Sequence, residues 1–268
     1  MDVKSHTFGK RCRYTYEDED YIGRGTYGIV YKAAITDPGD LTVHGPAPVA
    51  VKVVPLHKDS EVLANVESWN SWRSRMELLL TLQCDHLICY HQVSVARSST
   101  FGGVSVKLLM DYYEDGDLAS LIKTKAVEDL QTAIRYASEI ADAVNHLHLK
   151  NIVHGDIKPG NILIHRLGTN NKLLLGDLDD LVQMQQSMTC SGDLSHIRGT
   201  LRYMSPEMLK KYLNLEHEKV GRKSDIWSVG CVILEMIDSA VGNINKRLYR
   251  TPDGALNADT IKKIGTLL

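Results

Sequence analysis

The sequence contains no hydrophobic run long enough to cross a membrane. Its longest apolar stretch, Val229 to Ile237, is interrupted by Glu235 and falls far short of the roughly 20 residues that a membrane span requires. The first residues, Met1 to Asp20, are polar and end in an acidic run, so the apolar core of a signal peptide is missing as well. We therefore expect a protein without a membrane span that works in the cytoplasm, with the nucleus as the other option.

Cysteines are few and scattered, and an excess of charge of one sign is lacking. The cysteines are odd in number and form no CxxC pair, which argues against a zinc site or a disulfide framework and fits reduced thiols. With 31 basic and 33 acidic residues the net charge is −2, so binding to nucleic acid has no electrostatic support. The five cysteines are Cys12, Cys84, Cys89, Cys190 and Cys231.

Apolar residues are abundant and change their periodicity along the chain. Hydrophobic side chains make up 43% of the 268 residues, which suffices for one core or two small lobes. Residues 21–112 read as short β-rich runs interrupted by one helix over Glu61 to Gln83. Helical periodicity follows over Leu130 to Leu149 and over Asp225 to Met236, where Asp225 is suited to cap the helix. The predicted strands are 21–22, 29–35, 49–54, 87–95, 104–110 and 172–175. The apolar stripe of the first of these two helices is Ile134, Ala137, Ile140, Ala141, Val144 and Leu147.

The most informative segment is the loop His154 to Asn161, which carries a carboxylate, an ammonium and an amide close together. Asp156 can orient and accept the proton of an attacking hydroxyl. Lys158 supplies positive charge for phosphate oxygens, and Asn161 offers a ligand for Mg²⁺. These are the groups that transfer of a phosphoryl group needs.

Further motifs stand in order around this loop. A glycine-rich run precedes it, followed by an apolar strand that contains a lysine, and three more motifs come after it. The motifs are Gly23 to Val30, Val49 to Lys52, Gly176 to Asp179, Gly199 to Glu207 and Asp225 to Gly230. Together with the loop they resemble the eukaryotic protein kinase family. The lysine and proline at positions 158 and 159 favour the serine/threonine type, and the two last motifs are similar to kinases that act atop MAP-kinase cascades.

The resemblance implies an α+β, bilobal fold with a small antiparallel β-sheet lobe that contains one helix and a larger, mainly helical lobe. We place a polar N-terminal segment at residues 1–17, the nucleotide-binding lobe at 18–112 and the catalytic lobe at 113–268. The catalytic lobe is expected to be shortened at its C-terminal end. In the family, the glutamate matched by Glu207 pairs with an arginine far downstream, for which the possible substitutes are Arg222, Lys246, Arg247, Arg250 or water.

The resemblance also implies ATP as the cofactor and assigns its binding residues. Lys52 would meet the α- and β-phosphates and be held by a helix glutamate, for which Glu77 is better placed than Glu61 or Glu67. The connector that ends at Asp117 would contact adenine through its backbone, and Asp117 itself either reaches the ribose or only caps the next helix. The complete set is Ile22, Gly23, Arg24, Gly25, Gly28, Val30, Ala50, Lys52, Glu77, Met110, Asp111, Tyr113, Asp117 and Leu163.

Catalytic and metal-binding residues follow from the same resemblance. Asp156 would be the catalytic base, Lys158 would contact the γ-phosphate, and Thr200 would bond to both of them. Asn161 and Asp177 would bind Mg²⁺. The implied activity is transfer of the γ-phosphate of Mg-ATP to a Ser or Thr hydroxyl of a protein substrate in intracellular signalling.

Two positions depart from the family pattern. Asp179 replaces the glycine of the Asp-Phe-Gly motif, which restricts the backbone and adds negative charge near the phosphates. Gly155 replaces an arginine that normally pairs with a phosphorylated residue of the activation segment. Gly155 removes one means of switching the enzyme, whereas Asp179 favours the alternative function, a nucleotide-binding pseudokinase that acts as a scaffold or allosteric partner. A phosphotransferase for small molecules is a third option.

Overall fold

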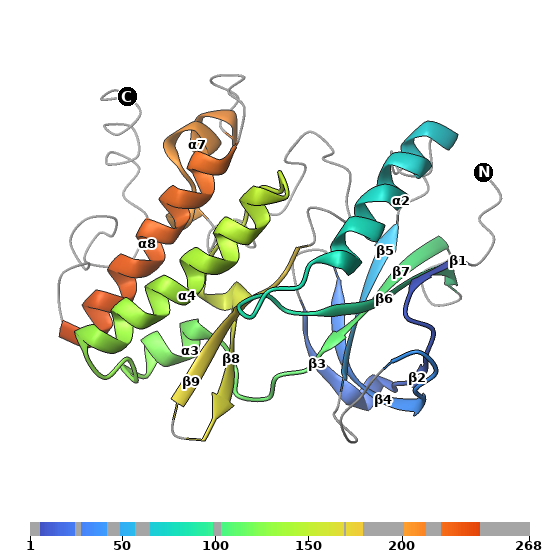
Figure 1. The fold of residues 1–268 in the computed structure, drawn as a ribbon, viewed down its shortest axis with the longest axis horizontal. Helices are drawn as coiled ribbons and strands as arrows, with labels where there is room; N and C mark the ends of the chain where they lie inside the picture. The colour runs from blue at the N-terminus through green and yellow to red at the C-terminus, as the bar shows by residue number, and fades with distance from the viewer. Residues whose placement is uncertain are drawn as a thin grey trace. The chain divides into compact units, whose positions relative to one another are not determined.

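The computed structural model describes residues 6–24, 28–41, 49–56, 65–98, 103–168, 170–178, 201–212 and 221–241. These residues divide into two compact units (Figure 1). The described residues up to Tyr113, together with Leu178, form the first unit. The second unit contains the described residues from Glu114 to Asp177 and those from Leu201 onward.

The first unit is built on one antiparallel sheet, which contains seven strands within the described residues. The order in the sheet is β1-β6-β7-β5-β4-β2, with β3 paired to β4. Pairing of β1 with β6 and of β2 with β4 was not predicted, because both strands lie in the segment interpreted as polar surface chain. The strands are β1 (His6–Gly9), β2 (Arg13–Thr15), β3 (Tyr21–Arg24), β4 (Ile29–Asp37), β5 (Val49–Leu56), β6 (Tyr90–Ser98) and β7 (Gly103–Asp111), and a 3-10 turn, η1, covers Asp18–Asp20.

Helix α2 (Val66–Thr81) packs against β6 and β1 of this sheet (Figure 1). It begins after Asn65, whose side chain accepts a hydrogen bond from the Ser68 amide at 2.8 Å. The buried face of the helix comes from Trp69, Trp72, Met76 and Leu79, which recur at three- and four-residue spacing.

Aromatic rings connect β1 to this helix. The rings of His6 and Trp69 lie 5.5 Å apart, and those of Phe8 and Trp72 lie 6.4 Å apart. The two tryptophan rings stack on each other at 5.2 Å. Edge and offset contacts of this kind add to the free energy gained by burial of the rings. Strand β1 therefore helps to fix the position of α2.

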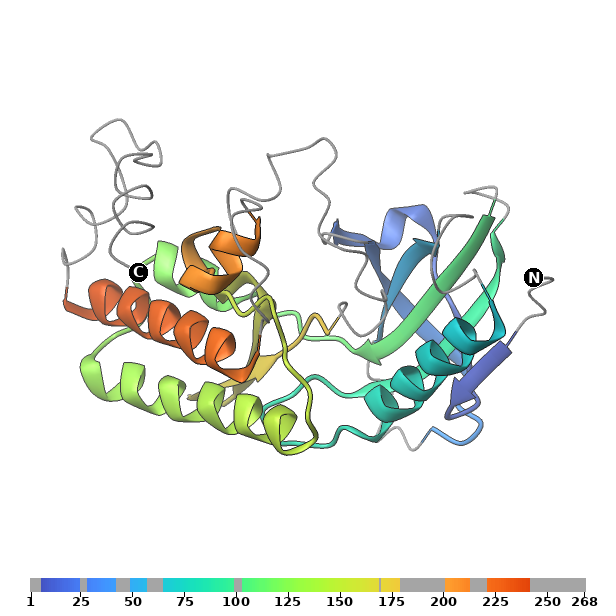
Figure 2. The same ribbon diagram turned by 90° about the horizontal axis from the view of Figure 1, so that it is seen from above.

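The second unit is mainly helical. Helices α4 and α8 lie side by side in both ribbon views (Figures 1 and 2), and α4 also contacts the β8–β9 hairpin. The predicted α+β class is confirmed by the sheet of the first unit and the helices of the second. The elements of the second unit are α3 (Leu118–Lys123), α4 (Leu130–Leu149), η2 (Pro159–Asn161), β8 (Ile162–Leu167), β9 (Asn170–Leu175), η3 (Leu201–Tyr203), α7 (Pro206–Tyr212) and α8 (Arg222–Val241).

Two expectations about these helices were wrong. Helix α8 begins at Arg222, so Asp225 lies inside its first turn and is not the residue that caps it. The apolar stripe predicted for α4 includes Ile134, whose exposed fraction is 62%, and Ala141, which is also exposed. Ile140, Val144 and Leu147 of the predicted stripe are buried, and the buried face continues over Ala133, Tyr136 and Ala143.

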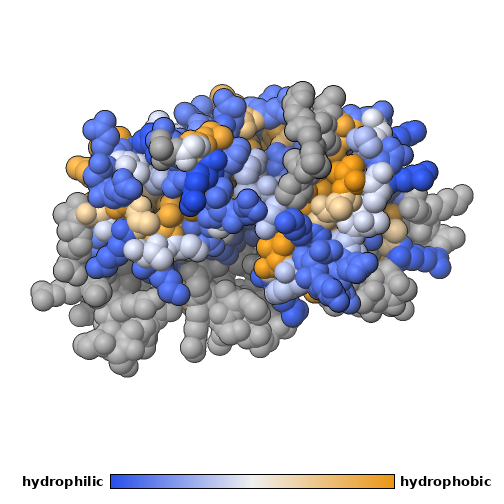
Figure 3. Space-filling model, turned by 90° about the horizontal axis from the view of Figure 1, so that it is seen from below, coloured by the Kyte–Doolittle hydropathy of each residue, from blue (hydrophilic) through white to orange (hydrophobic). Residues whose placement is uncertain are grey.

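The face of the molecule drawn in Figure 3 is mostly hydrophilic, and its hydrophobic side chains form small, separate patches. Scattered apolar residues of this kind are ordinary on protein surfaces. None of the helices within the described residues has the length and the apolar character that a bilayer span requires.

The two isoleucines of α4 provide a matched test of which face is buried. Ile140 is 2% exposed and Ile134 is 62% exposed. We expect Ile140→Ala to lower the free energy of unfolding by about 2–5 kcal/mol through lost burial and a cavity. Ile134→Ala should change it by less than about 0.5 kcal/mol, because solvent already surrounds that side chain. Urea unfolding of both variants measures the difference, and equal losses would contradict the observed orientation of the helix.

Candidate active site

Strand register brings the predicted nucleotide-binding residues of the first unit to one face of the sheet. Lys52 lies opposite Val30 on β4, and Ala50 lies opposite Met110 on β7. Residues directly opposite in antiparallel strands, and residues two apart in one strand, share a face. Gly23 on β3 continues this row, because it lies opposite Val30.

Lys52 is 5% exposed in the middle of β5. An ammonium among apolar strand residues requires an anionic or polar partner. Glu77, the predicted helix partner of Lys52, is half exposed and accepts a hydrogen bond from Arg73 Nε at 2.8 Å, one turn earlier in α2. Glu67 is exposed, and Glu61 lies outside the described residues. The pairing of Lys52 with Glu77 stays a prediction.

Arg75 is the charged residue of α2 whose side chain is partly buried. Its Nε and Nη2 atoms are buried and have no hydrogen-bond partner among the described residues. Burial lowers the pKa of this guanidinium. Nothing in the sequence pattern predicts this arrangement, since arginine on a helix is ordinarily solvated.

The glycines of the segment Gly23 to Val30 differ in whether their surroundings leave room for a side chain. A Cβ at Gly28 would lie 2.6 Å from the Val53 carbonyl oxygen, so the close approach of the two strands requires glycine there. At Gly23 a Cβ would meet no atom within 4 Å, so packing against the described residues does not explain that glycine. Gly25 lies outside the described residues. Ile22 and Arg24, on β3, are exposed.

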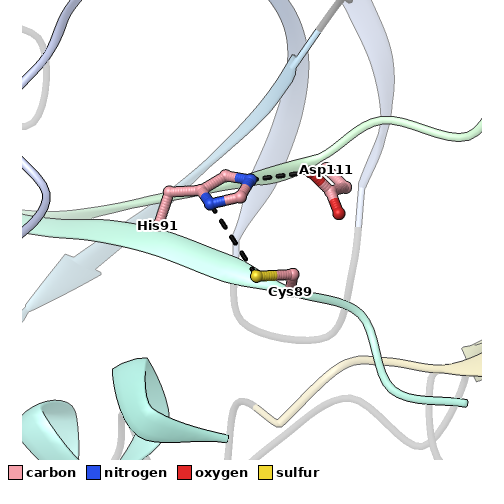
Figure 4. A group of neighbouring side chains, drawn as sticks. All are labelled: Cys89, His91 and Asp111. Carbon is pink, nitrogen blue, oxygen red and sulfur yellow. Dashed lines mark hydrogen bonds and ion pairs between the residues drawn. The ribbon is translucent and has the colours of Figure 1, made fainter. Parts of the chain in front are cut away.

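A polar network surrounds Asp111 at the end of β7 (Figure 4). Its Oδ1 lies 2.7 Å from His91 Nε2, and its Oδ2 accepts a hydrogen bond from the Tyr113 hydroxyl at 3.2 Å. The other ring nitrogen of His91 lies 3.8 Å from Cys89 Sγ. Burial, followed by the charge of Asp111, raises the pKa of Tyr113. The side chain of Asp111 is thus held within the first unit, while its backbone belongs to the predicted adenine connector.

Protonation of His91 in this network makes stability depend on pH. Burial alone would lower the pKa of His91, but hydrogen bonds to Asp111 and Cys89 and the negative charges of both groups raise it from 6.5 to about 9. A folded-state pKa above the unfolded value means that the stabilisation is complete below pH 6.5. It is lost as the pH rises through about 9.

We therefore expect the free energy of unfolding to fall more steeply between neutral and alkaline pH in the native protein than in His91→Gln, which cannot titrate. Urea unfolding at several pH values measures the two slopes. The same comparison in a Cys89→Ser background removes the thiol that faces His91, and Asp111 and Tyr113 remain in both proteins. Parallel slopes for the native protein and His91→Gln would contradict the raised pKa.

In the second unit, residues of the predicted catalytic loop donate hydrogen bonds to Asp156. Lys158 Nζ donates to Asp156 Oδ2 at 2.6 Å. Asn161 Nδ2 donates to the same oxygen at 3.1 Å and to the backbone carbonyl of Asp156 at 2.8 Å. Asp156 Oδ1 is buried and has no hydrogen-bond partner among the described residues. The structure therefore brings together three residues that the sequence predicted.

The same loop forms hydrogen bonds with Gly176, the residue between the end of β9 and Asp177. The Gly176 amide donates to the Asn161 carbonyl at 2.9 Å, and His154 Nε2 donates to the Gly176 carbonyl at 2.8 Å. Asp177 has a φ of +61°, in the left-handed region that aspartate tolerates better than most residues. Asn161 and Asp177, the predicted metal ligands, both offer side-chain oxygens, which suit Mg²⁺.

Three further residues of the second unit have partners that could not be predicted from the sequence. Asp117 accepts a hydrogen bond from the Ser120 amide at 2.8 Å, so it caps α3. Leu163 forms a bridge with Asp117 and is partly buried. Glu207 accepts a hydrogen bond from the Ser224 hydroxyl at 2.7 Å, and Ser224 is not among the partners predicted for it from the sequence.

Some predicted residues cannot be placed. Thr200, Asp179 and the phosphorylatable part of the activation segment lie outside the described residues. Gly155 is described and has a φ of +79°, in the region that favours glycine. Replacement of the family arginine by glycine at this position therefore relieves backbone strain.

Comparison with protein families matches residues 16–247 to the protein kinase domain. This chain belongs to the protein kinase family. Similar curated proteins include MAP kinase kinase kinase SSK2 of Saccharomyces cerevisiae, 28% identical over 83% of this chain and 14% of that protein. Mitogen-activated protein kinase kinase kinase 4 of Homo sapiens is 27% identical over 88% of this chain and 13% of its own length. Serine/threonine-protein kinase nekl-2 of Caenorhabditis elegans is 30% identical over 83% of this chain and 57% of its own length.

These relatives confirm the predicted resemblance to the group of MAP kinase kinase kinases. The kinase chain spans about one-seventh of the length of the first two relatives, as their covered shares of 14% and 13% state. The similarity therefore concerns the kinase domain of much longer proteins.

Sequence reasoning missed the group that holds the catalytic loop of this kinase in place. Asp225 is 1% exposed, and its carboxylate accepts hydrogen bonds from the backbone amides of His154 and Gly155, both at 2.9 Å. A third contact joins Asp225 Oδ2 to His148 Nε2 at 2.8 Å. The apolar residues that follow Asp225 were a usable signal, because a carboxylate that is buried beside them requires polar partners.

Asp225→Ala should therefore destabilise the kinase. Two backbone amides lose their acceptor at roughly 1–3 kcal/mol each, so we expect the free energy of unfolding to fall by about 3 kcal/mol. Urea unfolding measures the loss. Asp142→Ala, which removes an exposed carboxylate from α4, is the matched control and should lie within about 0.5 kcal/mol of the native protein. A near-neutral Asp225→Ala would exclude the proposed anchoring role.

Proposed function

We propose that this chain is a serine/threonine protein kinase domain that transfers the γ-phosphoryl group of ATP to a protein hydroxyl. The observation that supports this most directly is the unequal environment of the two Asp156 oxygens. Oδ2 accepts hydrogen bonds from Lys158 and Asn161, whereas Oδ1 is buried and has no hydrogen-bond partner among the described residues. A buried acceptor without a donor costs free energy. The hydroxyl of a substrate is a donor of the required kind.

In the proposed mechanism, Asp156 orients the hydroxyl and accepts its proton at Oδ1. Lys158 and Asn161 hold the carboxylate at its other oxygen, so its orientation is fixed before the substrate arrives. The ammonium of Lys158, 2.6 Å from Asp156 Oδ2, would also offset negative charge that develops on the transferred phosphate. Oriented general bases of this kind contribute about 10²–10⁴-fold to the rate.

Lys52 would contact the phosphates from β5, and the backbone of the connector around Met110 and Asp111 would bind adenine. Both assignments are supported by the family match and by the shared face of Val30, Ala50, Lys52 and Met110. The buried ammonium is suited to a strongly anionic ligand such as a triphosphate.

Asn161 and Asp177 would hold Mg²⁺, which when bound neutralises charge on the phosphate oxygens. The donor set fits this cation, because it consists of an amide oxygen and a carboxylate. Both Nδ2 contacts of Asn161 are directed to Asp156, which fixes the amide so that its oxygen is the atom left for a cation.

A protein substrate is proposed because the relatives are named as protein kinases, and several of them as MAP kinase kinase kinases. On that basis we place the domain in a signalling cascade, where its substrate would itself be a kinase. The scattered cysteines, odd in number and without a CxxC pair, support a location in the cytoplasm or nucleus.

Asp156→Asn tests the proposal. It should lower phosphate transfer to a generic Ser/Thr protein substrate by about 10²–10⁴-fold, because the amide cannot accept the hydroxyl proton. The affinity for Mg-ATP, measured separately with a fluorescent nucleotide, should remain within a few-fold. Asp142→Asn, an exposed site on α4, serves as the control and should transfer phosphate at the native rate.

The two possible failures have different meanings. If Asp156→Asn incorporates phosphate at the native rate, Asp156 is not the catalytic base. If the native protein binds Mg-ATP but transfers no phosphate, the pseudokinase alternative replaces the proposed enzyme.

A further inference from the structure

Cys89, His91 and Asp111 form a connected row of side chains in the first unit (Figure 4). Cys89 precedes β6, His91 is the second residue of that strand, and Asp111 ends the neighbouring strand β7. The distance from Sγ to His91 Nδ1 is 3.8 Å, and that from His91 Nε2 to Asp111 Oδ1 is 2.7 Å. The imidazole therefore lies between a thiol and a carboxylate.

Asp111 determines which proton the imidazole carries. A carboxylate accepts, so the nitrogen that faces it, Nε2, carries a proton, and Nδ1 is the nitrogen that exchanges a proton with the thiol. A nucleophile within reach of a base that is oriented by a third group is the general arrangement of an activated nucleophile. The proposed kinase reaction makes no use of these three side chains.

Charge distinguishes Cys89 from other cysteines of the chain. The pKa of His91 is raised to about 9, so the imidazole is largely protonated at neutral pH and places a positive charge beside Sγ. Cys12 and Cys231 have the opposite surroundings. Burial, followed by the charge of Asp37, raises the pKa of Cys12, and burial, followed by the charge of Glu235, raises that of Cys231. Reactivity of a cysteine requires the thiolate and access for the reagent, and Cys89 is partly exposed.

We propose that Cys89 is an activated thiol and a modification site for hydroperoxides and other small electrophiles, with His91 as its proton partner and Asp111 as the group that orients His91. In the reactive pair His91 Nδ1 holds the proton that the thiol has given up, and the thiolate sulfur attacks one oxygen of the hydroperoxide. The S–O bond forms as the O–O bond breaks. The leaving oxygen takes the proton from His91, which gives a sulfenic acid and water or an alcohol. Sulfur is oxidised by two electrons and the peroxide is reduced by two.

A resident metal ion fits the same row less well. The row supplies only three ligand atoms that lie within 4.8 Å of one another, whereas a closed zinc site uses four. Both nitrogens of His91 are also engaged, one with the carboxylate and one with the thiol. The arrangement is therefore better suited to proton transfer than to coordination.

Modification of Cys89 would affect nucleotide binding through Asp111, an argument that rests on the proposed function. The Asp111 amide donates to the Cys89 carbonyl at 3.1 Å, and the Asp111 carboxylate is held by His91 and Tyr113. An added oxygen on sulfur enlarges the side chain and competes for His91. Asp111, whose backbone belongs to the proposed adenine connector, then loses its present hydrogen-bond geometry.

Site-resolved alkylation of the full chain tests the thiol independently of kinase activity. Limiting iodoacetamide is added to the native protein, and mass spectrometry gives the rate of labelling at each cysteine. Cys84, which is also partly exposed, is the internal control. We expect Cys89 to be labelled at least about tenfold faster than Cys84, and His91→Gln to remove most of that advantage while the rate at Cys84 is unchanged. Equal rates at the two cysteines, or no effect of His91→Gln in a variant that remains folded by circular dichroism, would overturn the proposal.

A second experiment uses hydrogen peroxide and a reagent that traps sulfenic acids. The trapped adduct should form at Cys89 in the native protein and be absent in Cys89→Ser. If a chelator accelerates labelling and one equivalent of Zn²⁺ prevents it, the row is a metal site and the proposal is overturned. Nucleotide affinity is measured separately: a loss on peroxide treatment that Cys89→Ser abolishes supports the route through Asp111. Labelling at Cys89 in a protein that binds no nucleotide would reject the proposed function alone.

Discussion

The proposed catalytic geometry depends on the hydrogen bonds that the buried carboxylate of Asp225 accepts. A buried charge is costly in an apolar environment unless hydrogen bonds compensate it, and here two backbone amides and one imidazole do so. The amides belong to His154 and Gly155, the residues directly before Asp156. Because α8 packs against α4 and carries Asp225 in its first turn, the position of the proposed catalytic aspartate follows from the packing of two helices. The packed helices thus hold the loop that carries Asp156 in one position.

Local patterns predicted a large part of this structure. The α+β class, the bounds of the helix Leu130–Leu149 and the grouping of Asp156, Lys158 and Asn161 all followed from periodicity or from one short segment. Such features are determined by neighbours in the chain, so a single sequence contains the necessary information.

The features that escaped prediction depend on distant partners. The contact between Asp225 and the His154 amide spans 71 positions, and a carboxylate near a helix start is equally consistent with a cap. Ile134 has the right spacing for the apolar stripe, but which flank of the helix is covered is decided by the elements packed against it. Strands β1 and β2 are short and polar, and only their pairing with β6 and β4 makes them strands.

Strand β1 lies before residue 16, where the match to the kinase domain begins, yet it contacts the helix that carries Glu77 and Arg75. His6 and Phe8 cover Trp69 and Trp72 through ring contacts, and the Arg73 guanidinium lies over the Phe8 ring at 5.5 Å. A ligand that binds the segment around β1 only after the strand has left β6 also shifts the conformational equilibrium of α2. The size of that shift equals the free energy with which α2 stabilises the attached strand. Strand β1 and helix α2 are therefore thermodynamically coupled, although the strand lies outside the part of the chain that matches the kinase domain.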